Sequence, residues 1–188
     1  MVQRCILRRV DLKKGVSIAR IIRGYSFDPT TGLLTLIATD TFDLEPAFDI
    51  KEITSDDVMY IAAVGYSAIG EQIQIFSFDG ASLTEITDAA FSHSTVYSAD
   101  WLSFNDTLYL AVGGDAGEDN TPVRIYSFDG VSLNLATELD LAYVPSSVEW
   151  QVLDGVAYLL IGGKYLTPQP ADADPLFIYQ LVLTNCDT

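Results

Sequence analysis

The sequence has few of the residues that most enzyme and metal sites use. It holds one histidine, His93, and two cysteines, Cys5 and Cys186, which lie near opposite ends of the chain. A lone histidine with no titratable partner beside it gives little basis for acid–base catalysis. The two cysteines form neither a CxxC pair nor a Cys/His cluster of the kind that binds zinc. We therefore expect no enzyme activity, no catalytic residue, no metal site and no cofactor.

Positive charge is also scarce, with ten Lys and Arg against 26 Asp and Glu, a net charge of −16. An acidic chain repels phosphate, so we expect no nucleic-acid partner. Residues 1–24 differ, because they carry a net charge of +6 and leave −22 for the rest. This region is too polar for a membrane-spanning helix, so we expect no membrane partner. Its basic residues are Arg4, Arg8, Arg9, Lys13, Lys14, Arg20 and Arg23.

The basic segment, residues 1–17, has two interpretations. It can dock on an acidic body, its own or a neighbour's, because opposite charges steer surfaces together. Alternatively, its charges form the solvated side of an edge strand and discourage aggregation. The cysteines leave a similar choice. Cys5 and Cys186 are either free thiols or, in an extracellular setting, are bonded within one chain or between chains.

What the sequence does have is an internal repeat. Ile75–Gly80 (IFSFDG) returns fifty residues later as Ile125–Gly130 (IYSFDG). Other landmarks keep nearly the same step. The aromatic of this motif recurs at Tyr25, Phe76, Tyr126 and Tyr179, a second tyrosine recurs at Tyr60, Tyr109 and Tyr158, and tryptophan recurs at Trp101 and Trp150. A period of this size is typical of an array of small supersecondary units.

Each unit is predicted to contain four strands. Its short apolar or alternating runs are separated by Gly, Pro, Asp and Asn, and no segment has a competing helical period. Asn105-Asp106 and Asp154-Gly155 predict tight turns, because these residues tolerate positive φ. The expected domains are the basic segment 1–17 and repeats over residues 18–188. The repeat units span about 32–78, 82–128 and 132–183, with a partial unit before them.

Four antiparallel strands in about fifty residues is the blade of a β-propeller. Residues 98–101 (SADW), followed by residues 108–114 (LYLAVGG), resemble the inner strands of WD40-like propeller repeats. The pairs Gly113-Gly114 and Gly162-Gly163 also resemble the kelch diglycine. The resemblance covers residues 20 to 183 and implies an all-β, β-propeller-type array.

Three complete blades do not close a ring, since propellers have about 4–8 blades. An open array leaves apolar faces that need a covering surface. We therefore expect a structural or interaction scaffold that binds a protein partner or forms a homo-oligomer, either a ring or a fibre. The alternative is a small-ligand or glycan-binding propeller fragment. In that case Trp101 and Trp150 would stack on sugar rings, although their place in apolar strands favours core packing.

Three weaker features have ordinary explanations. The acidic loops 115–120 and 172–174 carry oxygens that suit Ca²⁺, but they lack EF-hand spacing and are interpreted as solvated loops. Residues 105–107 (NDT) match the N-glycosylation pattern. Glu52 stands where the other units have tryptophan, which indicates either a weaker blade or an edge adapted to a partner.

Overall fold

The computed structural model describes residues 4–5, 21–41, 44, 46–67, 72–89, 95–115, 122–141, 143–164 and 176–180. The regular structure in these residues is β-strand, as the sequence predicts. In chain order the strands are β1 (Arg4–Cys5), β2 (Ile21–Asp28), β3 (Leu33–Thr41), β4 (Ala47–Ser55), β5 (Val58–Gly65), β6 (Ile73–Phe78), β7 (Leu83–Ala89), β8 (Thr95–Phe104), β9 (Thr107–Asp115), β10 (Val123–Phe128), β11 (Leu133–Leu139), β12 (Val144–Leu153), β13 (Val156–Lys164) and β14 (Leu176–Gln180).

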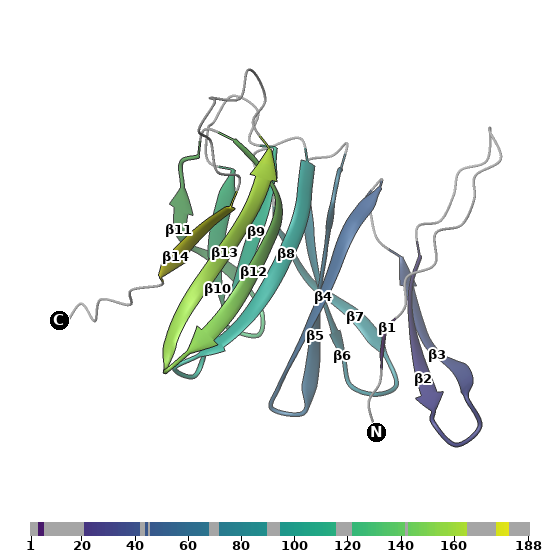
Figure 1. Cartoon of the computed structure of the whole chain (residues 1–188). Coiled ribbons are helices and arrows are strands. Elements are labelled where there is room, and N and C mark those ends of the chain that lie inside the picture. Colours follow the sequence, from purple (N-terminus) through teal and green to yellow (C-terminus); the bar gives the residue numbers. More distant parts are fainter. Residues whose placement is uncertain are drawn as a thin grey trace, which may run out of the picture.

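The strands form four antiparallel sheets, β1–β3, β4–β7, β8–β11 and β12–β14, each in sequential order. Figure 1 shows the sheets side by side in chain order, with β1–β3 at one end and β12–β14 at the other. The first strands of the last three sheets, β4, β8 and β12, are neighbours in space. Consecutive meandering sheets that pack face to face form a β-propeller-type array. The predicted fold class is confirmed.

The sheet boundaries differ from the predicted repeat units by one strand. The last unit was expected to begin with the strand at residue 133, but this strand, β11, pairs with β10 in the preceding sheet. The reason is the short turn after Phe128, which joins β10 and β11 as a hairpin. The described residues accordingly contain two four-stranded sheets between two three-stranded ones, where three complete blades were expected. Apart from β1, the basic segment 1–17 lies outside the described residues.

Tight turns connect the first two strands of each of the last three sheets. Both central residues have positive φ at Asn105 (50°) and Asp106 (59°), and again at Asp154 (52°) and Gly155 (75°). Two successive positive φ values define a type I′ turn, whose twist matches that of the flanking strands. Both predicted turns are confirmed. The turn at Asp56-Asp57 has the same conformation, although neither residue is a glycine.

The Asp-Gly pair of the repeated motif closes a second kind of turn. The Asp129 Oδ1 atom accepts hydrogen bonds from the backbone N–H groups of Val131 (2.9 Å) and Ser132 (2.7 Å), and Asp79 does the same one repeat earlier. Gly130 follows with a φ of 92°, which side chains disfavour. Bonds from backbone N–H groups stabilise the carboxylate and lower the pKa of Asp129 below its usual value of 3.8. The repeated motif therefore builds hairpins.

We expect Asp129→Asn to make the chain less sensitive to acid. Because the folded-state pKa is lowered, this carboxylate stabilises the fold above its unfolded pKa, and the stabilisation is lost as the pH falls through the folded pKa. Asparagine keeps an acceptor oxygen but cannot titrate. Urea midpoints should therefore show the variant weakened at about pH 7, with a smaller difference at about pH 3. Asp140→Asn, beyond the far end of β11, is the charge-matched control. An equal difference at both pH values would contradict the assignment.

A β-bulge interrupts the first strand pair of each of the last three sheets. The irregularities lie between Ala47 and Asp49, between Val96 and Ser98, and between Pro145 and Ser147. Each bulge brings the strand backbone against a glycine on the neighbouring strand. A Cβ atom at Gly114 would lie 2.1 Å from the carbonyl oxygen of Thr95, and Gly65 and Gly163 are similarly crowded by backbone oxygens. The glycine that recurs at this position therefore leaves room for the bulged backbone.

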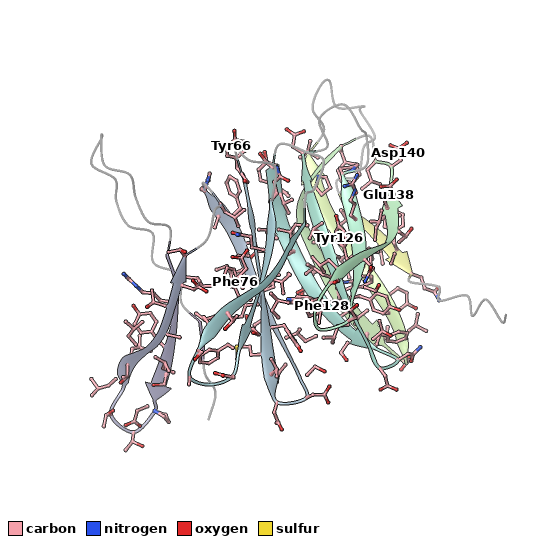
Figure 2. All side chains as sticks on the ribbon, turned by 180° about the vertical axis from the view of Figure 1, so that it is seen from behind. Tyr66, Phe76, Tyr126, Phe128, Glu138 and Asp140 are labelled. Atoms are coloured by element: carbon pink, nitrogen blue, oxygen red, sulfur yellow. The ribbon has the colours of Figure 1, made fainter. Side chains whose placement is uncertain are left out.

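The core consists of three apolar clusters, and each fills the space between two consecutive sheets. Phe76 and Phe78 contribute to the cluster between the first two sheets, while Tyr126 and Phe128 contribute to the next one (Figure 2). In the two middle sheets the repeated aromatic is buried, with Phe76 0% and Tyr126 5% exposed. Each sheet in the middle of the array is therefore covered on both faces.

Candidate functional site

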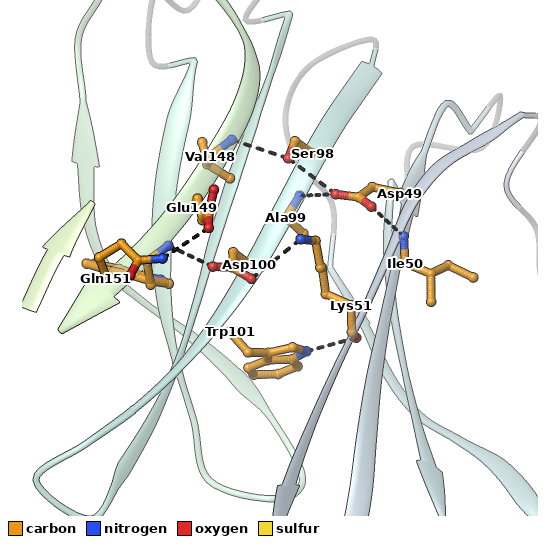
Figure 3. Close-up of polar contacts among 11 residues, drawn as sticks. Asp49, Ile50, Lys51, Ser98, Ala99, Asp100, Trp101, Val148, Glu149 and Gln151 are labelled. Atoms are coloured by element: carbon orange, nitrogen blue, oxygen red, sulfur yellow. Dashed lines mark hydrogen bonds and ion pairs between the residues drawn. The ribbon is translucent and has the colours of Figure 1, made fainter. Parts of the chain in front are cut away.

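Polar side chains on the first strands join neighbouring sheets. The Asp49 carboxylate on β4 accepts hydrogen bonds from the Ser98 hydroxyl and from the backbone N–H of Ala99, both at 3.2 Å (Figure 3). The Ser98 hydroxyl in turn accepts a bond from the backbone N–H of Val148 on β12, also at 3.2 Å. Asp49 and Ser98 occupy the same place in successive repeats. A single pattern of contacts therefore links three sheets.

Asp100 makes a second set of contacts along the same strands. Its carboxylate accepts a hydrogen bond from the backbone N–H of Trp150 at 2.7 Å and lies 3.7 Å from the Lys51 Nζ atom (Figure 3). Burial raises the pKa of Asp100 above 3.8, and this outweighs the bond from Trp150 and the charge of Lys51. The ionised group therefore costs folding free energy at neutral pH, and protonation removes this cost as the pH falls through the folded pKa.

The two tryptophans belong to the core. Trp101 is 7% exposed and Trp150 is 6% exposed, in the clusters on either side of the sheet β8–β11. The Trp101 Nε1–H group donates to the Lys51 carbonyl oxygen at 3.2 Å, and its ring lies 5.6 Å from that of Phe128. The Trp150 Nε1 atom has no hydrogen-bond partner among the described residues. The core interpretation is confirmed, and neither ring is placed to stack on a ligand.

The last sheet exposes positions that are buried in the middle of the array. Ile75 is 0% exposed and Ile125 is 5% exposed, whereas Ile178, at the same repeat position on β14, is 63% exposed. Ser147 and Glu149 on β12 are exposed, although their repeat equivalents carry the contacts between sheets. These three residues define what we call the β14 face. The face presents an apolar side chain and two hydrogen-bond acceptors to solvent.

The first sheet has exposed side chains on the side that faces away from the second sheet. Leu34 on β3 is 49% exposed, whereas its repeat equivalents, Leu83 and Leu133, are half-buried against the preceding sheet. Tyr25 on β2 is half-buried, although Phe76 and Tyr126 are buried at the same position. Leu34 and Tyr25 define the β3 face. Among the described residues, both ends of the array thus lack the neighbouring sheet that covers the middle sheets.

The other residues considered from sequence either lie outside the described residues or occupy exposed positions. His93, Cys186, the loop 172–174 and residues 116–120 lie outside the described residues, and only the backbone of Cys5 is described. Asn105 lies in an exposed turn, which suits a glycosylation site sterically. Glu52 is exposed where the other repeats bury tryptophan. Within the described ranges no group of three His, Cys, Asp or Glu residues is arranged to hold a metal ion. No helix in that part of the chain is long and apolar enough to cross a membrane.

Comparisons with known proteins give no family. A scan against protein-family models and a search of curated proteins each found no match. Among solved structures the chain is similar to the GH32 beta-fructofuranosidase of Bombyx mori, with 9% sequence identity and a TM-score of 0.43. The similarity covers 75% of this chain and 39% of that enzyme, so the chain spans less than half of its length. A similarity at this level carries no information on function.

Proposed function

We propose that the chain is a non-catalytic structural or interaction scaffold that self-associates through its two terminal sheets, as a ring or a fibre. The exposure of Ile178, at a position where Ile75 and Ile125 are buried between sheets, carries this proposal. Full burial of such a side chain contributes about 1.5–3 kcal/mol. A partner that covers the β14 face therefore gains the same kind of contact that already joins the middle sheets.

A second copy of the chain suits this face. The β3 face offers Leu34 and Tyr25. In the third sheet their repeat equivalents, Leu133 and Tyr126, pack in the same cluster as Ile75 of the preceding sheet. If the β14 face of one copy packs on the β3 face of another, the contact repeats the way in which consecutive sheets pack within the chain. The charges agree with this arrangement, because the chain begins with a region of net charge +6 and carries −22 over the remainder. Such head-to-tail contacts build rings or open filaments.

The proposal includes the nature of the repeats, which we assign as WD40-like with kelch-like diglycines. Support comes from residues 98–101, which lie on the first strand of a sheet, and from Gly113-Gly114 at the end of the second. Their described contacts are structural. Asp100 and Ser98 join sheets, and Gly114 makes room for a bulge. A set of residues used in this way favours a scaffold over an enzyme.

We expect Ile178→Glu to weaken self-association at least tenfold, because a charge would be buried in the contact. Sedimentation velocity over a range of protein concentrations measures the change, and circular dichroism checks the fold. Leu135→Glu is the matched control, since Leu135 is 52% exposed but lies on β11, away from both terminal faces. The control should associate as the unmodified chain does. Equal association of Ile178→Glu and Leu135→Glu would contradict the use of the β14 face.

Mixing two variants tests whether the contact is head to tail. Ile178→Glu damages the β14 face and Leu34→Glu damages the β3 face, so each variant alone should be monomeric. An equimolar mixture retains one intact face of each kind and should stop at a dimer. Particles larger than a dimer in the mixture, or dimers of either variant alone, would show that the two faces do not pair with each other.

A further inference from the structure

The three β-bulges place their extra residues at one end of neighbouring sheets. The unpaired residues are Phe48 on β4, Tyr97 on β8 and Ser146 on β12, which follow one another at steps of 49 residues. A bulge redirects a side chain out of the regular pleat. The repeat therefore generates a row of side chains at matching positions, independent of the residues that form the core.

Two of these side chains are aromatic and reach solvent. Phe48 is 48% exposed and Tyr97 is half-buried, and their rings meet edge to face with centroids 5.3 Å apart. The fold does not need an aromatic ring here, because Ser146 occupies the third bulge with the same backbone pairing. Exposed rings that the fold does not require are available for a ligand.

Polar groups lie at the same end of the sheets. Tyr66 is 39% exposed, and its backbone N–H donates to the Pro46 carbonyl oxygen at 3.0 Å, which places it beside the first bulge (Figure 2). Asp115 ends β9 and pairs with Thr95, two residues before Tyr97. Tyr66 and Asp115 occupy the same repeat position. They add a hydroxyl and a carboxylate to the two aromatic rings.

We propose that Phe48, Tyr97, Tyr66 and Asp115 form a binding ledge for a neutral sugar ring. The CH-rich face of a sugar packs on an aromatic ring, while its hydroxyls bond to a phenol and a carboxylate. Ligand sites generally combine apolar and aromatic contacts with a few placed polar groups. The net charge of −16 disfavours an anionic ligand such as a sugar phosphate. This ledge is separate from both terminal faces.

The test uses neutral hexasaccharides built from glucose, mannose, xylose or galactose, together with tetramethylammonium as a cationic probe. Calorimetry and saturation-transfer NMR should detect binding of at least one hexasaccharide to the whole chain. Phe48→Ala and Tyr97→Ala should each weaken that binding at least tenfold, whereas Leu135→Ala, at an exposed position away from the ledge, should not. Ser146→Tyr should strengthen it, because it adds a third ring to the row.

Thermal unfolding checks the fold of each variant. Misfolding could explain a loss of sugar affinity in the alanine variants, but it could not explain the gain of affinity expected for Ser146→Tyr. Three results would overturn the proposal. The first is that no hexasaccharide binds at millimolar concentration. The second is that both alanine variants bind the sugar as tightly as the unmodified chain. The third is that tetramethylammonium binds to the ledge and the sugars do not. The last result would assign the rings to cation binding.

Discussion

Gly114→Ala is expected to destabilise the folded chain by about 3 kcal/mol, since overpacking a close contact typically costs this much. The added Cβ atom would lie 2.1 Å from the Thr95 carbonyl oxygen and 2.8 Å from the Val96 Cα atom. Both are backbone atoms of the bulged strand, so no rotamer change can relieve the contact. The bulge must move or flatten. Chemical denaturation of the two proteins measures the difference.

Gly162→Ala is the matched control for this substitution. Gly162 lies in the second diglycine, but an added Cβ atom there would have its nearest neighbour, the Ser147 Cβ atom, at 3.9 Å, an ordinary contact. We expect this variant to unfold within about 0.5 kcal/mol of the unmodified chain, as surface substitutions generally do. Equal losses for Gly114→Ala and Gly162→Ala would mean that the bulge is not the reason for the glycine.

Trp101→Ala is expected to cost about 4 kcal/mol, within the range for removing a buried tryptophan. The side chain fills the cluster between the second and third sheets, and its Nε1–H bond to Lys51 joins those sheets directly. Its loss should loosen one interface of the array rather than one hairpin. Thermal and urea unfolding report the change, and hydrogen exchange should show the greatest loss of protection in β4 and β8.

Phenylalanine variants separate packing from the hydrogen bond. Trp101→Phe removes the bond to Lys51, whereas Trp150→Phe removes an Nε1–H group that has no partner among the described residues. We therefore expect Trp101→Phe to be more destabilising by about 1 kcal/mol, the usual net value of one hydrogen bond. Equal losses in the two variants would argue that the bond to Lys51 contributes nothing.

Much of the fold is predictable from the sequence because the repeat shows the same local chemistry several times. The Asp-Gly pairs, the type I′ turns at Asn105-Asp106 and Asp154-Gly155, and the alternation of apolar residues each fix a hairpin. The position in the repeat at which each sheet begins and ends is harder to predict from the sequence. The repeat alone does not show which of the four strands begins a sheet. The pairing of β6 with β7 and of β10 with β11 in the structure shows where each of these sheets ends.

The contacts between sheets were not predictable, because they join residues about fifty positions apart through backbone groups. Asp49 and Ser98 differ in type, and the shared role emerges when both are seen to accept bonds from the next strand. The sequence does contain one indication of this shared role: Asp49 lies as far before Trp101 as Ser98 lies before Trp150. The bulges are hard to predict for a similar reason, since each repeat has the same extra residue, such as Tyr97, and the repeat length is unchanged.

The mass of the unmodified chain in solution tests the central claim most directly, which is that the β14 and β3 faces cover each other in neighbouring copies. Sedimentation velocity over a range of concentrations should give particles at multiples of 20.5 kDa, with the largest species growing as concentration rises. A single species of 20.5 kDa at every concentration, unfolding cooperatively with Ile178 and Leu34 exposed, would contradict the claim.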